Sequence, residues 1–391
     1  MLISALIAIS SLPIEALAYN QDDFDWYGDY EYVDTINLDG SESVSGSNEY
    51  CTWSYDAESS TVYIDGEIIE SSQNAYADTE YDKDTGMVTC QLNNARLPLY
   101  TEVDDNGVTR EQYCTDDFEH LVIGKNTKSF KSHISDMYYK NLKDITFEEG
   151  CELTEIGKGA FYRCAAESIT LPDTVSSIGE SAFELSNIKE FVVPTSVTVI
   201  PKNMFYKSKL EKIQIPSGVE KISERAFANT NISEIDIPET VTSIGAYAAQ
   251  DTKISQAVFP SSFKYVPEGF FCNCKNVTSI DFLSSAFTGL RNACFSGCSI
   301  TDLDFSKTNI TYIGDYAFGG CESLKTVVLN KNTTYLSGFN NCPNLEHVEF
   351  TDKVTAIGQS AFKDDENTTF SAIPDSVYQV YSMAFQNSGI T

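Results

Sequence analysis

The sequence predicts a solenoid of stacked repeats of about 22 residues, preceded by a small β-rich region. Three observations predict it: an aromatic anchor recurs at nearly constant spacing, a proline series recurs at the same spacing, and each repeat carries a short alternation of apolar and polar residues. A unit of this length is too small to bury its own apolar face. Successive units must therefore stack and pair their strands in a parallel sheet along one side.

The anchor of each repeat is usually a phenylalanine that follows a small residue. Eleven anchors keep register, with spacings between 21 and 24 residues: Phe161, Phe183, Phe205, Phe227, Ala249, Phe271, Phe295, Phe318, Phe339, Phe362 and Phe385. The proline series has a spacing of 22 and consists of Pro172, Pro194, Pro216, Pro238 and Pro260, with Pro374 resuming it near the end. Because the anchor series and the proline series have the same spacing, the repeat cannot be a chance pattern.

The repeat that ends at Phe227 shows what each part contributes. Ile213 and Ile215 flank a polar residue, which predicts a short strand with one buried face. Pro216 has no N–H group and therefore ends the strand's hydrogen-bonding ladder. Ile222 returns an apolar side chain to the interior, and Phe227 fills the centre of the coil.

Five cysteines occupy one position, three residues after the anchor: Cys164, Cys274, Cys298, Cys321 and Cys342. Other repeats have serine or threonine there, which indicates a small buried position and favours reduced thiols. Occasional disulfides between neighbouring repeats and a metal site are the alternatives. In the N-terminal part, Cys51, Cys90 and Cys114 allow one disulfide, and the sequence leaves its partners open.

The charge of the chain is strongly negative and uneven. The formal net charge is −31, with 25 acids and 3 bases in residues 19–119 but 31 acids and 23 bases in residues 120–391. Such a polyanion is unsuited to nucleic acid or anionic lipid, because affinity for these comes from Lys and Arg. The step in charge predicts a boundary near residue 120, between an acidic β-rich cap region (19–119) and the repeats (120–391).

Residues 1–18 have the features of an export signal. An apolar run is followed by Ala16-Leu17-Ala18, a pattern of small residues typical of signal cleavage. A membrane anchor and a buried helix are the alternatives, although the run is short for a span of about 20 residues. We expect a mature protein without a membrane span that is secreted or located at the cell surface.

The order of strand, Ile-Pro, Val-x-x-Ile-Gly and Ala-Phe-x-x-Cys resembles the BspA-like class of leucine-rich repeats of surface and secreted proteins. The resemblance covers residues 120–391, and residues 52–56 and 61–66 resemble the small β cap that precedes such repeats. It implies a right-handed leucine-rich-repeat solenoid with a parallel β-sheet on the concave face and short helical or 3₁₀ turns and loops elsewhere. It also implies binding of proteins or other macromolecules rather than catalysis.

The sequence departs from this pattern mainly after residue 260. Ala249 replaces the aromatic anchor, and the repeat between Phe271 and Phe295 is two residues longer than the first ones. Leu283, Ser306, Asn330 and Thr351 replace the proline after the strand. We expect these irregularities to bend or loosen that half. The chain ends without a polar capping repeat, which suggests a truncated chain.

No motif of a known catalytic or cofactor chemistry occurs. The three histidines, His120, His133 and His347, lie outside any HExxH pattern, and no nucleophile elbow, Walker loop or dinucleotide fingerprint is present. We therefore predict no enzyme activity, no cofactor and no metal centre. Residues 82–86 and 104–107 resemble calcium loops slightly; hairpin turns are the favoured interpretation, with weak calcium binding as the alternative.

The side chains that flank the inward strand position point away from the core, because side chains alternate along a strand. Stacked repeats then make two outward columns, from which we select a candidate binding strip: Glu190, Lys212, Gln214, Glu234, Asp236, Asp281, Asp302, Asp304, His347 and Glu349. Like charges in adjacent strands repel. The strip is either an ordinary solvated acidic face or a site for a basic protein partner, or for calcium bridging the carboxylates.

These observations predict a non-enzymatic, adhesin-like binding protein that recognises a protein or other macromolecule through the concave face. One alternative is the recognition arm of a larger surface protein whose anchor or catalytic domain lies beyond residue 391. A hydrolase within the acidic N-terminal region is a third hypothesis, and no convergent motif favours it.

Overall fold

The computed structural model describes residues 44–47, 51–56, 59–66, 97–103, 109–114, 118–130, 141–281, 283, 285–370 and 372–389. All of them belong to one compact unit, residues 38–391. The predicted export signal and Cys90 lie outside the described residues, and so do the two calcium-like loops.

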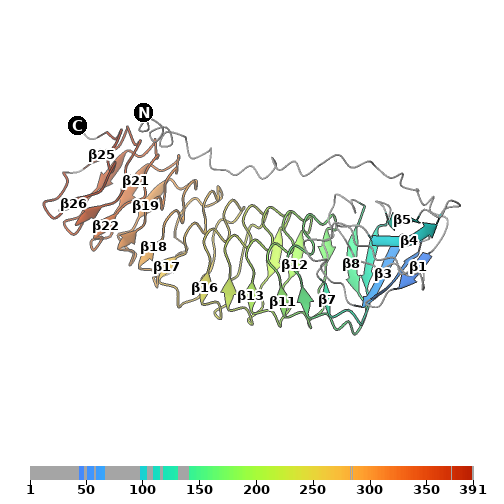
Figure 1. Cartoon of the computed structure of the whole chain (residues 1–391). Helices are drawn as coiled ribbons and strands as arrows, with labels where there is room; N and C mark the ends of the chain where they lie inside the picture. Colours follow the sequence, from blue (N-terminus) through green and yellow to red (C-terminus); the bar gives the residue numbers. More distant parts are fainter. Residues whose placement is uncertain are drawn as a thin grey trace, which may run out of the picture. The chain divides into compact units, whose positions relative to one another are not determined.

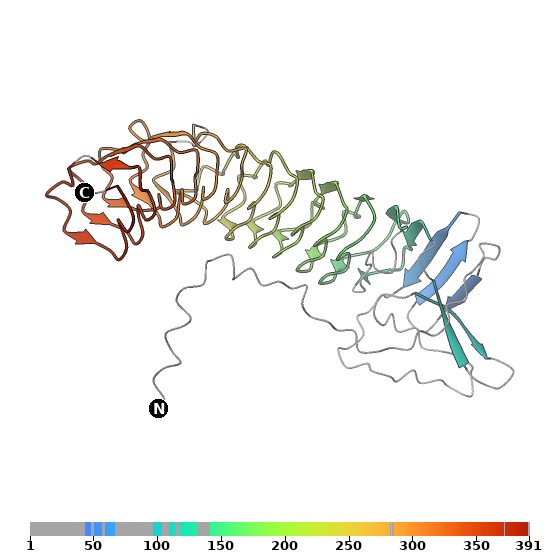
Figure 2. The ribbon, with the colours of Figure 1, turned by 90° about the horizontal axis from the view of Figure 1, so that it is seen from above.

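The repeats form a parallel β-solenoid in which successive turns stack on one another (Figures 1 and 2). The first ladder of strands is the predicted one. It consists of β6 (His120–Ile123), β8 (Asp144–Phe147), β10 (Ser168–Ile169), β12 (Glu190–Val192), β14 (Lys212–Gln214), β19 (Asp302–Asp304), β21 (Thr326–Val328), β23 (His347–Glu349) and β25 (Thr369–Phe370). Each strand pairs in parallel with the equivalent strand of the next turn, except between β14 and β19.

Each turn also contributes to a second parallel ladder, which the sequence did not predict and which is interrupted after residue 178 and after residue 244. Its strands are β7 (Ser129–Phe130), β9 (Glu155–Ile156), β11 (Ser177–Ile178), β13 (Val199–Ile200), β15 (Lys221–Ile222), β16 (Ser243–Ile244), β17 (Tyr265–Val266), β18 (Gly289–Leu290), β20 (Tyr312–Ile313), β22 (Tyr335–Leu336), β24 (Ala356–Ile357) and β26 (Gln379–Val380). These strands span two residues each, which is too short for an alternation of apolar and polar residues to be recognised.

An antiparallel hairpin continues the first ladder beyond the solenoid. β1 (Val44–Ser47), β2 (Cys51–Asp56) and β3 (Thr61–Gly66) are antiparallel neighbours, and β3 pairs in parallel with β6. β4 (Leu97–Val103) and β5 (Thr109–Cys114) form a separate antiparallel pair. Pairing of β3 with β6 satisfies the edge of the first turn, which would otherwise be open to strand addition. The assignment of residues 19–119 as a cap domain stays a prediction.

The anchors form the predicted column through the centre of the solenoid. Phe161, Phe183 and Phe205 are completely buried, and their rings stack with centroid distances of 5.2 Å and interplanar angles of 11–12°. A second run of stacked rings extends from Phe271 to Phe385, with centroid distances of 5.0–5.7 Å. The repeated phenylalanine therefore supplies an aromatic contact between successive turns within each of these two runs.

The structure compensates for the missing ring at Ala249. The following repeat carries two adjacent phenylalanines, Phe270 and Phe271, and both are completely buried. Their rings meet edge to face at 4.8 Å, and Phe259 meets Phe270 in the same geometry at 5.0 Å. Because Phe270 takes a position that is usually alanine, the repeat next to the gap restores apolar volume.

The backbone around each anchor follows a pattern that the side chains do not reveal. In almost every turn the residues two before and two after the anchor have positive φ. Ser181 (56°) and Leu185 (59°) flank Phe183, and Asn203 (55°) and Lys207 (57°) flank the next anchor. Positive φ is unfavourable for residues other than glycine by roughly 1–2 kcal/mol. The stacked turns must therefore stabilise it.

A third set of hydrogen bonds between turns provides that stabilisation. Alternate N–H groups donate to the next turn: Ser181 N to Lys202 O (3.0 Å), Phe183 N to Met204 O (2.9 Å) and Leu185 N to Tyr206 O (2.8 Å). The groups between them make i→i+3 bonds within their own turn, as from Ser186 N to Phe183 O (3.3 Å). The predicted helical or 3₁₀ segments are thus single turns separated by positive φ, and no helix occurs among the described residues.

We expect replacement of Lys207 by glycine to raise the free energy of unfolding by about 0.5–1 kcal/mol. Glycine removes the steric penalty of the positive φ. This gain in stability exceeds the added entropic cost of folding, which arises because glycine makes the unfolded chain more flexible. Lys209→Gly is the matched control, because Lys209 is also exposed but does not have positive φ. It should lower the free energy of unfolding by a similar amount in urea titrations, and equal effects of the two substitutions would contradict the interpretation.

The cysteines of the repeat position are buried, as predicted, and are free thiols. Four of them donate to the carbonyl of the preceding anchor, for example Cys298 Sγ to Phe271 O (3.1 Å) and Cys321 Sγ to Phe295 O (3.2 Å). Where the position is threonine, as at Thr230, the hydroxyl donates to its own anchor's carbonyl instead. Burial raises the pKa of Cys321 to about 12, so these groups stay protonated and are poor nucleophiles.

Candidate binding surface

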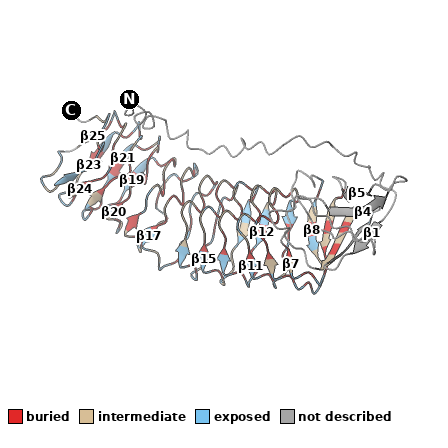
Figure 3. Ribbon diagram, in the orientation of Figure 1, coloured by how far each residue is buried: buried red, intermediate tan, exposed pale blue. Residues whose placement is uncertain are grey.

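The first ladder determines which side chains of the predicted strip reach solvent. In β12, Phe191 is buried while Glu190 and Val192 are exposed, and in β19, Leu303 is buried between the exposed Asp302 and Asp304 (Figure 3). All ten strip residues are exposed: Glu190, Lys212, Gln214, Glu234, Asp236, Asp281, Asp302, Asp304, His347 and Glu349. The inward and outward assignment made from the alternation is confirmed.

Strand pairing aligns the outward residues as predicted wherever the ladder is continuous. In the N-terminal half, Glu190 lies opposite Lys212 and Val192 opposite Gln214. In the C-terminal half, one column contains Asp302, Thr326 and His347, and the other contains Asp304, Val328 and Glu349. Each half therefore presents two adjacent columns on one face.

The middle of the strip differs from the prediction. Glu234, Asp236 and Asp281 belong to no strand, and the described residues between β14 and β19 make a single isolated bridge in this ladder, from Asp236 to Val258. The interruption coincides with the repeat that has alanine at the anchor and with the repeat that is two residues longer. The strip is thus two strand-borne groups rather than one continuous column.

Charge in the N-terminal group is largely compensated. Lys212 Nζ and Glu190 Oε1 form an ion pair at 2.7 Å. The hydrogen bond to Glu190 raises the pKa of Lys212, so this base remains charged. The pair is exposed, and such pairs contribute little to stability. Gln214 adds no charge, so this group offers a partner few unpaired charges.

Charge in the C-terminal group is uncompensated within the strip. Asp302 Oδ1 accepts a hydrogen bond from Thr326 Oγ1 at 2.6 Å, and Asp304 Oδ1 accepts one from the Ser306 N–H at 2.8 Å. These hydrogen bonds lower the pKa of both carboxyl groups, which therefore remain ionised well below neutral pH. Together with Glu349, they make an exposed acidic group on β19 and β23.

A comparison with known families identifies the repeats. The profile of the BspA-type leucine-rich repeat region, which comprises six copies, matches residues 132–254, 242–369 and 337–391. The chain belongs to the BspA-type leucine-rich repeat family. The resemblance drawn from the strand, proline and anchor pattern is confirmed, and so is the solenoid fold.

Several solved leucine-rich repeat structures are similar to this family member. A cell surface protein from Faecalibacterium prausnitzii is 18% identical, with a TM-score of 0.48 over 88% of this chain and 92% of that one. A protein from Eubacterium ventriosum is 17% identical, with a TM-score of 0.46 over 90% and 96%. The pneumococcal vaccine antigen PcpA is 16% identical, with a TM-score of 0.40 over 87% and 94%. No curated protein matches the chain.

Neither a metal cluster nor a membrane-spanning helix is found in the described parts of this repeat protein. No three His, Cys, Asp or Glu side chains there are grouped to hold a metal ion. In the same parts no helix has the length and apolar character needed to cross a bilayer. His120 is half-buried, and its Nδ1 lies 2.7 Å from Asp144 Oδ2.

The sequence reasoning missed a group of side chains on the outer face of the second ladder. Tyr265, Tyr312 and Tyr335 are the first residues of β17, β20 and β22, and the first two are exposed. The signal was present, because tyrosine recurs at one position of the repeat. The strands at this position span only two residues, so the sequence did not reveal that the tyrosines lie on one face of a ladder.

Proposed function

We propose that this protein is a non-enzymatic, adhesin-like binding protein, secreted or held at the cell surface, that binds a basic protein surface. The binding site is the C-terminal part of the strip, centred on Asp302, Asp304 and Glu349. Membership of the leucine-rich repeat family supports a binding role rather than a catalytic one.

The observation that carries the proposal is the uncovered outer face of the first ladder. Parallel sheets are normally covered on both faces. Here the outer side chains are exposed, and they include valines in the same column as the carboxylates: Val192 (57% exposed), Val258 (69%) and Val328 (42%). Apolar side chains surrounded by charged ones resemble the core and rim of a protein interface.

The charge of this face favours a basic partner. Asp302, Asp304 and Glu349 lie on two strands separated only by β21, which contributes Thr326 and Val328. A cluster of one charge sign accelerates association with an oppositely charged partner and excludes partners of like charge. Lysine and arginine side chains of a partner would relieve the repulsion between the columns.

We expect the triple substitution Asp302→Asn, Asp304→Asn and Glu349→Gln to weaken binding to basic extracellular proteins by about tenfold or more. The control removes three exposed carboxylates elsewhere, by Asp173→Asn, Asp352→Asn and Glu366→Gln. Binding is measured by surface plasmon resonance on an array of extracellular proteins of known isoelectric point, in 150 mM salt with and without calcium.

The two triple variants have the same net charge. Their comparison therefore separates binding at the strip from general attraction by the negative charge of the whole protein. Equal binding by the two variants would refute the strip as the site. Binding that requires calcium and is lost in EDTA would instead indicate that the carboxylates act through calcium bridges. Unchanged thermal melting of both variants verifies that the fold is intact.

A further inference from the structure

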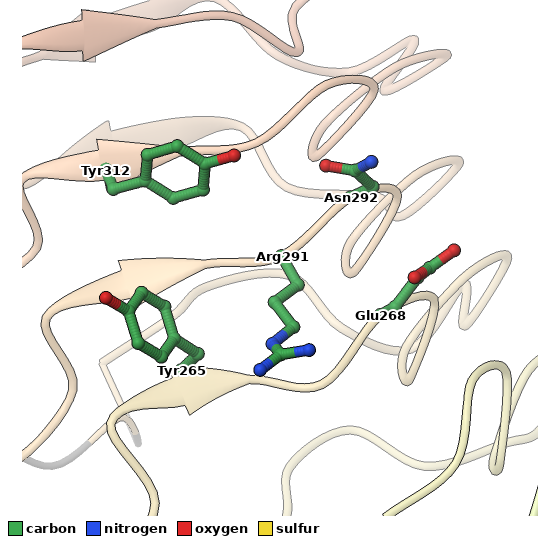
Figure 4. A pocket seen from close by; sticks show the side chains of 5 residues that line it. All are labelled: Tyr265, Glu268, Arg291, Asn292 and Tyr312. Carbon is green, nitrogen blue, oxygen red and sulfur yellow. The ribbon is translucent and has the colours of Figure 1, made fainter.

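The outer face of the second ladder contains a pocket of about 310 Å³ that is separate from the acidic strip. Its lining residues are Tyr265, Glu268, Arg291, Asn292 and Tyr312. They come from three successive turns, because β18 lies between β17 and β20 and pairs with both. Figure 4 shows the two tyrosine rings on either side of the middle strand, with the Arg291 side chain directed towards the turn of Tyr265.

Gly289 allows the two tyrosine rings to approach one another over the middle strand. It lies opposite both Tyr265 and Tyr312 in the ladder. A Cβ atom at this position would lie 2.9 Å from the ring of Tyr265 and 3.1 Å from Tyr312 Cβ. The φ of Gly289 is not positive, so the backbone conformation does not require glycine. The absence of a side chain here leaves room for the Tyr265 ring to lie over the middle strand.

The aromatic walls are held in place from outside the pocket. The ring of Tyr312 stacks on Tyr335 at 5.4 Å, with an interplanar angle of 17°. The hydroxyl of Tyr335 donates to Asp315 Oδ1 at 2.9 Å. The ring centroids of Tyr265 and Tyr312 lie 6.5 Å apart, with an interplanar angle of 82°. The Arg291 guanidinium lies 5.7 Å from the centroid of the Tyr265 ring. The two walls are therefore aromatic surfaces held in fixed positions. Tyr265 is 42% exposed and Tyr312 is 39% exposed.

The polar groups of the pocket retain free hydrogen-bonding capacity. Among the described residues, neither the Arg291 guanidinium nor the Glu268 carboxylate has an ion-pair partner, and the hydroxyls of Tyr265 and Tyr312 have no hydrogen-bond partner. Asn292 Oδ1 accepts from the Asp315 N–H at 3.1 Å, which leaves its Nδ2 free. Donors and acceptors are thus both available at one end of two aromatic walls.

We propose that this pocket binds a neutral pyranose unit of a glycan. A pyranose has an apolar C–H face, which packs against an aromatic ring, and a rim of hydroxyls, each of which both donates and accepts. Arg291 offers donors and Glu268 offers acceptors, and their charges balance, which favours a neutral ligand. The net charge of −31 further disfavours an acidic sugar.

The size of the pocket fits this ligand class. Ligand pockets span about 300–1,000 Å³ and combine aromatic walls with a few polar groups. At about 310 Å³ this pocket suits one or two sugar units rather than a folded protein epitope. The proposed glycan site goes beyond the protein-binding function, because it uses another ladder, other residues and another ligand.

The test is titration calorimetry of the full chain with maltohexaose, cellohexaose, mannohexaose and xylohexaose, together with saturation-transfer NMR. We expect at least one of the four to bind. Tyr312→Ala and Tyr265→Ala should each raise its Kd at least tenfold, whereas Tyr312→Phe should stay within threefold because it keeps the ring. Gly289→Val, whose side chain would displace the Tyr265 ring, should also raise the Kd at least tenfold. Tyr378→Ala, an 80% exposed tyrosine outside the pocket, is the control and should leave the Kd unchanged.

Several results would overturn the glycan assignment. These are no binding of any of the four sugars, or binding that the tyrosine variants do not change. Tyrosine-dependent binding of hexagalacturonate or decaproline in place of the neutral sugars would likewise reject it, in favour of an acidic sugar or an extended peptide. The strip variant (D302N, D304N, E349Q) should bind sugar as the wild type does, so failure of this proposal and failure of the protein-binding function are distinguishable.

Discussion

Replacement of Asp365 by asparagine is expected to flatten the pH dependence of stability between about pH 4 and pH 8. Asp365 lies three residues after the anchor Phe362, at the position that other repeats fill with Cys, Ser or Thr. It is completely buried, its Oδ1 accepts a hydrogen bond from the Cys342 N–H at 2.6 Å, and its Oδ2 has no partner. Burial raises the pKa of Asp365 to about 8, and the charge of Asp364 adds to this shift.

The direction of the effect follows from the two pKa values. An unfolded aspartate has a pKa near 3.9. Between this value and about 8, the folded protein holds a proton that the unfolded chain has released. The stabilisation is therefore fully present below about pH 4 and is lost as the pH rises through 8. At about 1.4 kcal/mol for each pKa unit, a shift of about four units corresponds to a loss on the order of 5–6 kcal/mol.

The measurement is the free energy of unfolding in urea at pH 4.5, 6, 7.5 and 9 for the wild type, Asp365→Asn and Asp352→Asn. An asparagine side chain cannot ionise. The free energy of unfolding of the wild type, relative to that of Asp365→Asn, should therefore fall steadily as the pH rises to about 8 and level off above it. Asp352 is exposed and serves as the control for loss of one carboxylate. Parallel curves for wild type and Asp365→Asn would show that Asp365 is ionised in the folded protein.

Replacement of Phe183 by alanine is expected to lower the free energy of unfolding by about 3–5 kcal/mol. The ring is completely buried and lies 5.2 Å from the anchor rings on either side, Phe161 and Phe205. The ring of Phe191, on β12, packs against it at 4.9 Å. One substitution thus removes contacts on both sides of a turn, and the stability of a solenoid depends on contacts between neighbouring turns.

Tyr378→Ala is the matched control, because it also truncates an aromatic side chain, but one that is 80% exposed. It should change the free energy of unfolding by no more than about 0.5 kcal/mol. Both variants are compared by urea and thermal unfolding. A loss below about 1 kcal/mol for Phe183→Ala would mean that the column of rings is not the main source of cohesion between turns.

The pattern of outward and inward side chains was predictable because it depends only on local geometry. Side chains alternate along a strand, so Phe191 and Leu303 had to point inward if Glu190 and Asp302 pointed outward. The register between turns followed from the constant repeat length. It failed between β14 and β19, where Glu234, Asp236 and Asp281 belong to no strand.

The positive φ values and the buried carboxyl group were not predicted, for two different reasons. Ser181, Leu185 and Lys207 have nothing in common as side chains, because hydrogen bonds to the next turn, and not local preference, hold their backbone. Asp365 could have been found at its repeat position, but its burial without a partner for Oδ2 depends on the packing of adjacent turns.

The sequence by itself determined the family, the repeat length, the aromatic column and the outward face of the first ladder. These features repeat, and each depends on residues within one turn or on the spacing between equivalent residues. Only the tertiary structure decided the second ladder and the pocket between Tyr265 and Tyr312. Both arise between turns, because two-residue strands acquire partners, and Tyr265 and Tyr312 meet across Gly289, only when neighbouring turns stack.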